Sequence, residues 1–160
     1  MSRRSSDPAP PVLDEPGSNL LLDLFVLDQR LGALLKTALL REGVAPAHYA
    51  VYGQVHRGAD TPGRLAERLS LSPGTLTGYL NLLERRGHLR RTKSESDGRS
   101  VTLTLTAAGE AKRKACETIV ADVVRRLDRS VGGAAARDEL RAALGRIAHG
   151  LDDVSATWHR

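Results

Sequence analysis

Two closely spaced helix-start signals constrain the fold of this chain more than any other feature. In each, a hydroxyl residue stands directly before a proline, first at Thr61-Pro62 and again at Ser72-Pro73. A serine or threonine side chain can accept a hydrogen bond from a backbone N–H of the first turn, and proline suits the first helical position because it has no N–H to leave unpaired. Leucines follow both signals at helical spacing. The sequence therefore predicts two short helices, joined by a tight break at Ser70-Leu71.

A β-hairpin rich in cations is predicted directly after the second helix. Gly87 suits the end of that helix, and Asp97-Gly98 is a turn signal. The segment Val101–Leu105 alternates apolar and hydroxyl residues, as a half-buried strand does. The segment Glu84–Arg99 holds six Arg or Lys residues against three acids. Two short helices followed by a basic hairpin indicate a winged helix-turn-helix that reads DNA, and Thr106 is placed to cap the helix that follows.

Five short motifs of this region stand in the order found in the MarR family of bacterial winged-helix transcription regulators, which the chain resembles. No single motif is specific, but the ordered set is. The resemblance implies a mainly α-helical fold with a small β-hairpin wing, in which the N- and C-terminal helices of two chains interleave into a dimerisation lobe. The motifs are Leu65–Leu69 (LAERL), Leu71–Thr77 (LSPGTLT), Leu82–Gly87 (LLERRG), Asp97–Arg99 (DGR) and Leu105–Gly109 (LTAAG).

The chain is predicted to hold a tail and a single domain. Residues 1–18 are rich in Ser, Pro and Asp and offer little apolar surface to bury, so this tail is predicted to be disordered. Residues 19–160 form the domain. Within it, residues 46–109 are the winged helix-turn-helix region, and residues 19–45 and 110–160 supply the dimerisation helices.

Long apolar stripes mark the helices on either side of the DNA-reading region. Helices are predicted over about 19–41, 46–57, 106–130 and 134–156, and Gly132-Gly133 separates the last two. In the third, Cys116, Ile119, Val120, Val123, Val124 and Leu127 are predicted to point inward. The first and last helices carry more apolar surface than one small lobe can cover, so we predict an interchain seam. Its predicted residues are Leu20, Leu24, Leu27, Leu140, Leu144, Ile147, Leu151, Val154 and Trp158.

The predicted partner of the central region is double-stranded DNA. The second short helix, Ser72 to Arg86, offers hydroxyl, glycine and amide positions that can approach base edges in a major groove. By resemblance, Arg99 enters the adjacent minor groove and Asp97 holds an arginine in place, while Gly98 stands where the family often has an arginine. The residues predicted to contact DNA are Thr61, Arg64, Ser72, Pro73, Gly74, Thr75, Thr77, Gly78, Tyr79, Asn81, Arg90, Arg91, Lys93, Asp97 and Arg99.

Each of these assignments has a plainer alternative. Hydroxyl side chains at a helix start commonly bind phosphate, so Ser72, Gly74 and Thr75 could set position without reading bases. The other threonines could be ordinary surface residues. Arg90, Arg91 and Lys93 could be a solvated strand. A twofold dimer that does bind DNA needs a pseudo-palindrome with half-sites about one helical turn, roughly 10 bp, apart.

The sequence gives little information about how the protein is regulated. By resemblance, a small, often phenolic or anionic, effector would bind between the dimer lobe and the winged domain, where His48, Tyr49, Tyr52 and His56 could line a cleft. Aromatic residues at helical spacing are more often core. Redox sensing through Cys116 and a metal site with Glu42 and His48 are weaker alternatives, since the thiol lies on a predicted buried face and the histidines are scattered.

Other functional classes find little support. The chain has no phosphate-binding loop, no nucleophile elbow and no paired metal-ligand motif, so we expect neither an enzyme nor a cofactor. A single cysteine excludes an intrachain disulfide, and no apolar run is long enough for a membrane span. We therefore expect a cytoplasmic homodimer. The net charge of +5 fits an anionic partner. The main rival is a winged helix that binds protein, whose wing would expose apolar residues in place of arginines.

Overall fold

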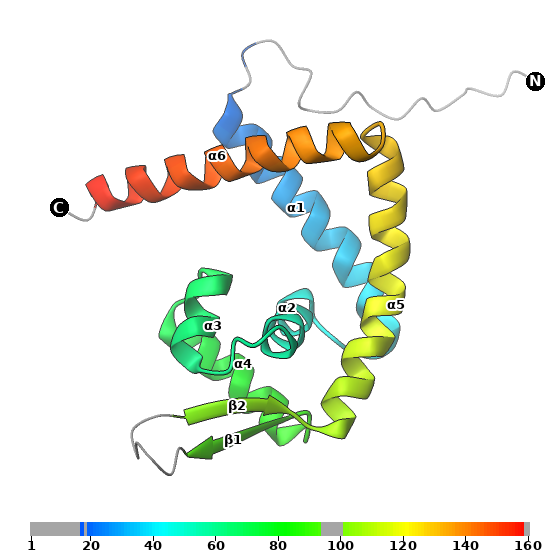
Figure 1. The fold of residues 1–160 in the computed structure, drawn as a ribbon, viewed down its shortest axis with the longest axis vertical. Coiled ribbons are helices and arrows are strands. Elements are labelled where there is room, and N and C mark those ends of the chain that lie inside the picture. Colours follow the sequence, from blue (N-terminus) through cyan, green and yellow to red (C-terminus); the bar gives the residue numbers. More distant parts are fainter. Residues whose placement is uncertain (1–16, 18, 94–100, 159–160) are drawn as a thin grey trace, which may run out of the picture. The chain divides into compact units, whose positions relative to one another are not determined.

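The fold is mainly α-helical with one two-stranded hairpin, as the sequence predicts (Figure 1). The computed structural model describes residues 17, 19–93 and 101–158, so the predicted tail lies outside the described residues apart from Gly17. The chain divides into two compact units, residues 1–116 and 117–160. In the described part of the chain, no helix is both long enough and apolar enough to cross a bilayer.

The first unit holds most of the secondary structure. It contains α1 (Leu20–Leu39), η2 (Leu40–Glu42), α2 (Pro46–His56), α3 (Pro62–Leu69), α4 (Pro73–Arg85), β1 (Leu89–Lys93), β2 (Val101–Leu105) and the beginning of α5 (Ala107–Ser130). The second unit contains the rest of α5 and all of α6 (Ala134–Trp158). The last helix therefore extends two residues beyond its predicted end.

The predicted caps set the beginnings of the two short helices. The Oγ1 of Thr61 accepts a hydrogen bond from the backbone N of Arg64 at 3.3 Å, and the Oγ of Ser72 does the same for Thr75 at 3.3 Å. Each cap is followed by proline at the first helical position. Between the helices, Ser70 adopts a left-handed conformation with a φ of 50°, which lets the chain turn sharply from α3 into α4.

The wing strands pair antiparallel, in a register that runs from Leu89 opposite Leu105 to Lys93 opposite Val101. Gly87 ends the preceding helix with a φ of 68°, as predicted for this position. On the outer side of β2, the backbone N of Leu103 donates to the carbonyl of Asp60 at 2.7 Å. This bond ties the hairpin to the segment that leads into α3.

The core of the first unit is built mainly from leucine and valine. Burying one such side chain stabilises a fold by about 1.5–3 kcal/mol relative to leaving it exposed. The buried stripe of α4 packs with residues from α2, α3 and β1, and β2 packs with α2 and α3, so α4 and the wing share one core. The buried apolar residues are Leu39, Val44, Val51, Tyr52, Val55, Ala59, Leu65, Leu76, Leu80, Leu83, Leu89, Leu103 and Cys116.

The start of α5 is fastened to the base of the wing. The hydroxyl of Thr106 donates to the carbonyl of Gly87 at 2.6 Å and accepts from the backbone N of Gly109 at 3.0 Å, so Thr106 caps α5 as predicted. The backbone N of Thr106 also donates to the carbonyl of His88 at 3.1 Å. The connection between hairpin and helix is therefore held at several points.

The later part of α5 corrects one prediction. Cys116 is fully buried and Ile119, Val120 and Val123 are half-buried, but Val124 is 47% exposed and Leu127 is 56% exposed. Helical spacing identifies the apolar face but does not say whether the same chain covers it. After α5, Gly132 and Gly133 adopt φ values of 95° and 98°, which break the helix where the sequence predicts a break.

Candidate nucleic-acid interface

One face of α4 is anchored in the core and the opposite face is open. Leu76, Leu80 and Leu83 are each at most 2% exposed. No atom lies within 4 Å of the position that a Cβ would take at Gly74 or Gly78, other than neighbours along the helix. In the cap and the first half of α4, the exposed residues are all predicted DNA contacts, namely Ser72, Pro73, Gly74, Thr75, Thr77 and Gly78.

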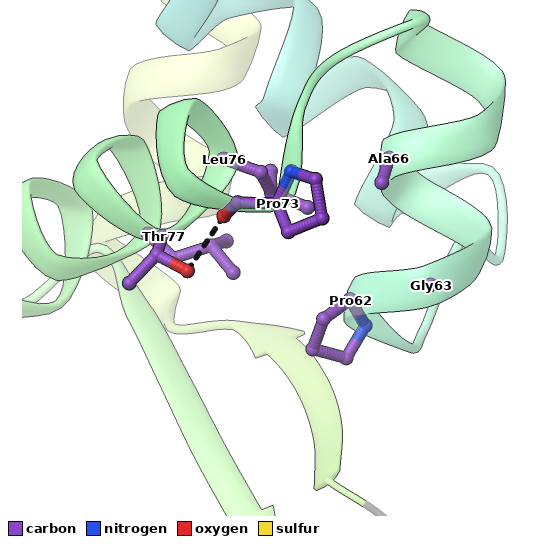
Figure 2. A pocket seen from close by; sticks show the side chains of 7 residues that line it. Pro62, Gly63, Ala66, Pro73, Leu76 and Thr77 are labelled. Carbon is purple, nitrogen blue, oxygen red and sulfur yellow. Dashed lines mark hydrogen bonds between the residues drawn. The ribbon is translucent and has the colours of Figure 1, made fainter. Parts of the chain in front are cut away.

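The hydroxyl groups on this face are oriented by bonds within the helix. The Oγ of Ser72 and the Oγ1 of Thr75 lie 2.9 Å apart. The Oγ1 of Thr77 donates to the carbonyl of Pro73 at 2.7 Å, the bond drawn as a dashed line in Figure 2. A hydroxyl oxygen keeps acceptor capacity after its hydrogen is donated. Thr77 therefore presents an acceptor whose direction is fixed before any ligand arrives.

A small hollow lies between α3 and α4, beside the exposed face. Its volume is about 150 Å³. Most of its lining is apolar, and the hydroxyl of Thr77 is the polar side-chain group in it. Figure 2 shows the two prolines, one from the start of each helix, at its edge. The lining residues are Pro62, Gly63, Ala66, Pro73, Leu76, Thr77 and Leu80.

The cationic side chains of the wing strand β1 lie in two environments, solvent and the surface of α4. Arg90 and Lys93 are exposed. Arg91 instead contacts α4: its Nη2 donates to Asn81 Oδ1 at 2.8 Å, and its Nε lies 3.7 Å from Glu84 Oε2. The sequence predicts Asn81 and Arg91 as separate DNA contacts, whereas the structure brings them together.

Of the remaining predicted DNA contacts, three lie within the described residues and two do not. Thr61 is the α3 cap, and Arg64 forms an exposed ion pair with Asp60 at 3.1 Å. Tyr79 is half-buried, with its ring edge-to-face on His48 at a centroid distance of 5.1 Å. The wing residues Asp97 and Arg99 lie outside the described residues.

The four residues predicted to line an effector cleft lie in different environments. Tyr52 is fully buried, and its hydroxyl lies 2.7 Å from the Nδ1 of His88. The Nδ1 of the exposed His56 lies 3.0 Å from Glu110 Oε1, within hydrogen-bond distance. His48 and Tyr49 are half-buried, and the Nδ1 of His48 is a buried atom without a hydrogen-bond partner among the described residues. Tyr52 therefore belongs to the core, which is the plainer alternative for this set.

Burial keeps the aromatic groups around the wing base uncharged. It raises the pKa of Tyr52 to about 12. It also lowers the pKa of His88, an effect to which the nearby Lys112 and Arg86 add, and it lowers the pKa of His48, with a further contribution from Arg86. The tie between Tyr52 and His88 thus joins two neutral groups near pH 7. Sequence patterns gave no sign of this pair, because the two residues come from distant segments.

The basic opening of α5 is occupied by contacts inside the first unit. Lys112 Nζ binds Glu42 Oε2 at 2.9 Å. The side chain of Arg113 is only 8% exposed and binds Glu110 Oε2 at 2.8 Å, a contact that holds the pKa of Glu110 below its usual range. These cations support the fold, and the exposed positive charge of β1 comes from Arg90 and Lys93.

Cys116 lies in a setting that disfavours reactivity. Its side chain is completely buried, and burial raises the pKa of its thiol. The thiolate is the reactive form, so a raised pKa makes oxidation slower. Within the described ranges, no three His, Cys, Asp or Glu side chains come together as a metal site would require.

Comparison with known proteins relates this arrangement to a family. Residues 42–100 match the model of the MarR family. The HTH-type transcriptional repressor MdtR of Bacillus subtilis is 28% identical over 100 residues, which are 62% of this chain and 64% of that protein. The HTH-type transcriptional regulator TtmR of Methylorubrum extorquens is 34% identical over 94 residues, which are 58% and 44% of the two chains. The match thus spans less than two thirds of either relative.

A solved structure extends the likeness to most of the fold. The transcriptional repressor CouR, bound to a 23-mer DNA duplex, superposes with a TM-score of 0.75 at 27% identity, covering 81% of this chain and 92% of its own. The paired helix caps, the basic hairpin, the family match and this superposition agree with one another. In sequence over residues 42–100, and in fold over most of the chain, this protein is similar to the MarR family of winged helix-turn-helix transcription regulators.

Proposed function

We propose that this protein is a repressor that binds a pseudo-palindromic DNA operator as a homodimer. The observation that carries the proposal is the outer face of α4, which is open and lined by short side chains while its leucines hold the helix in the core. A helix of this kind can approach base edges in the major groove closely. The relatives support the proposal, since CouR was solved on a DNA duplex and MdtR is named a repressor.

The wing supplies the second part of the interface. Arg90 and Lys93 are exposed on β1 and can neutralise phosphates beside the groove that α4 occupies. Arg99, for which the described residues give no geometry, stays the predicted minor-groove contact, with Asp97 as its support. Phosphate contacts would position the protein, and the α4 face would read the sequence.

Dimerisation rests on apolar surface that the described chain leaves uncovered. On α1, Leu20 is 58% exposed and Leu27 is 46% exposed. On α6, Leu144 and Leu151 are about half exposed, Trp158 is 84% exposed, and the helix buries no residue. Such stripes are costly to leave in water, and a second copy of the same helices would cover them. Two recognition helices would then meet half-sites roughly 10 bp apart.

A small-molecule effector is the last part of the proposal. We take the hollow between α3 and α4 as its candidate site, because the hollow is mostly apolar and adjoins the face of α4 that would enter the groove. A ligand there would touch Thr77 and Pro73 and compete with DNA for the same surface. The complete burial of Tyr52 makes that residue a poor candidate for contact with an effector.

A single charge on the open face tests DNA binding without disturbing the core. We expect Gly78→Glu to weaken DNA binding roughly tenfold or more, equivalent to about 1.4 kcal/mol, because the carboxylate would face phosphates and bases. Folding should not suffer, since Gly78 has open space around it and glutamate is the better helix former by about 0.5–1 kcal/mol. Gly145→Glu is the matched control, as Gly145 is also an exposed helical glycine with open space, on α6.

The binding assay begins with DNA selection. Sheared genomic DNA of the source organism is incubated with the protein, and bound fragments are sequenced and footprinted. A protected pseudo-palindrome that Gly78→Glu loses and Gly145→Glu keeps is the expected result. Equal binding by both variants would contradict the α4 assignment. No enrichment at low salt would leave a required co-ligand or a winged helix that binds protein, and a pull-down would be the next step.

A further inference from the structure

Arg90 and Arg91 are adjacent arginines on β1 whose side chains lie in opposite surroundings. Successive side chains of a strand point to opposite faces. Arg90 is exposed, whereas the side chain of Arg91 is 28% exposed and its Nε is buried, with no hydrogen-bond partner among the described residues and only an ion-pair approach to Glu84. In the hairpin, Arg91 stands opposite Leu103, which is 1% exposed. Arg91 therefore lies on the face of the wing that packs on the rest of the unit.

The contacts of Arg91 fasten the wing to one turn of the recognition helix. Its Nη2 donates to Asn81 Oδ1 at 2.8 Å, and its Nε lies 3.7 Å from Glu84 Oε2. Asn81 and Glu84 are three residues apart and so lie on one face of α4. A planar guanidinium can reach both at once, whereas a lysine ammonium is a single point of charge. The arrangement depends on arginine and not only on a positive charge.

The same contacts make Arg91 a poor phosphate ligand. The Glu84 carboxylate beside the guanidinium offsets part of its charge and would repel a phosphate that approached it. A phosphate would also have to replace the hydrogen bond to Asn81. Arg90, on the exposed side of the strand, has neither constraint in the described residues.

We propose that Arg91 is a positioning residue, which sets the wing against α4 through Asn81 so that both reach DNA together. The inference rests on the proposed DNA binding. It replaces the prediction that Arg91 neutralises a phosphate. DNA affinity then depends on the geometry of the Arg91 side chain. Arg91 itself neutralises no phosphate charge.

Salt dependence separates the two roles. Binding of the selected operator by wild type, Arg91→Ala, Arg91→Lys and Arg90→Ala is measured by fluorescence anisotropy over a range of salt concentrations. We expect both Arg91 variants to bind roughly tenfold more weakly at every salt concentration with an unchanged slope, while Arg90→Ala lowers the slope by about one unit. Wild-type affinity in Arg91→Lys, together with a slope lowered by about one in Arg91→Ala, would overturn the proposal.

A double-mutant cycle tests the link through Asn81. If Arg91 acts through Asn81, the double variant Asn81→Ala with Arg91→Lys should bind no more weakly than the weaker single variant. Additive losses would mean that the two residues contact DNA separately, against the proposal. Because Arg91→Lys keeps the positive charge and an aliphatic chain, the cycle does not depend on whether Arg91→Ala folds. Thermal unfolding of each variant confirms that it is folded.

A measurement without DNA distinguishes failure of this inference from failure of the proposed function. Hydrogen exchange of residues 89–93 should be faster in Arg91→Lys than in wild type, and unchanged in Arg90→Ala. Equal exchange in all three would overturn the inference even if DNA binds. Absence of DNA binding by wild type, with faster exchange in Arg91→Lys, would overturn the proposed function and leave the attachment of the wing standing.

Discussion

Gly109 stands where α5 comes closest to the start of β1. A Cβ at this position would collide with the backbone carbonyl of His88, a group that is itself bound to the backbone N of Thr106. Because the obstacle is backbone and not a flexible side chain, the helix or the strand would have to move. Glycine is required here because a Cβ has no room, and not because the backbone adopts a positive φ.

We expect Gly109→Ala to destabilise the protein by about 1–3 kcal/mol, the usual range for overpacking a tight site. The measurement is urea unfolding followed by circular dichroism. Gly145→Ala is the control, because its surroundings are open and alanine should raise helix stability by up to about 1 kcal/mol. Similar small gains in both variants would show that α5 does not approach the strand this closely.

At the scale of elements, α2 and the wing base are joined by the Tyr52–His88 pair. Its two atoms lie 2.7 Å apart, and burial with nearby cations lowers the pKa of His88. The unfolded chain then binds a proton more readily than the folded one, so stability rises with pH through this range. The contribution is complete above the unfolded value near 6.5 and is lost as pH falls below it. His48, whose pKa is also lowered, acts in the same direction.

We expect unfolding free energy to fall between pH 7.5 and pH 5.5, and to fall less in His88→Gln than in wild type. The glutamine amide can still meet the Tyr52 hydroxyl but does not titrate. Urea unfolding at the two pH values measures the difference. Glu110, whose pKa is lowered chiefly by Arg113, contributes its own loss only at more acidic pH. An equal fall in both proteins would remove His88 as a source of the pH dependence.

The helix boundaries are the best-predicted feature at this scale. Thr61-Pro62 and Ser72-Pro73 signal α3 and α4 because a cap and a proline act within one turn of the chain. Other boundaries are also set by local signals: Gly87 and the glycines at 132–133 end helices, and Thr106 caps α5. The exposure of Val124 and Leu127 was not predictable, since it depends on what lies against α5 and not on helical spacing.

On the scale of the whole molecule, the uncovered stripes of α1 and α6 lead to a prediction about assembly. We expect Leu144→Glu with Leu151→Glu to convert a dimer into a monomer, because two carboxylates would be buried in the seam. Light scattering after size exclusion gives the mass, and thermal unfolding should lose its dependence on protein concentration. Gly145→Glu should remain dimeric. A monomeric wild type would contradict the proposed assembly.

Local sequence patterns predict the order of the elements, the residues at which most of them begin and end, and the face of α4 that is open. These features follow from interactions within a turn or two of the chain, so a local pattern is enough to reveal them. The pairing of polar and charged residues, in contrast, depends on how the elements pack. Arg91 binds Asn81, Tyr52 meets His88 and Lys112 binds Glu42, so residues that lie apart along the chain hold the first unit together. Strand register and core packing bring these distant partners together, and no local pattern encodes either.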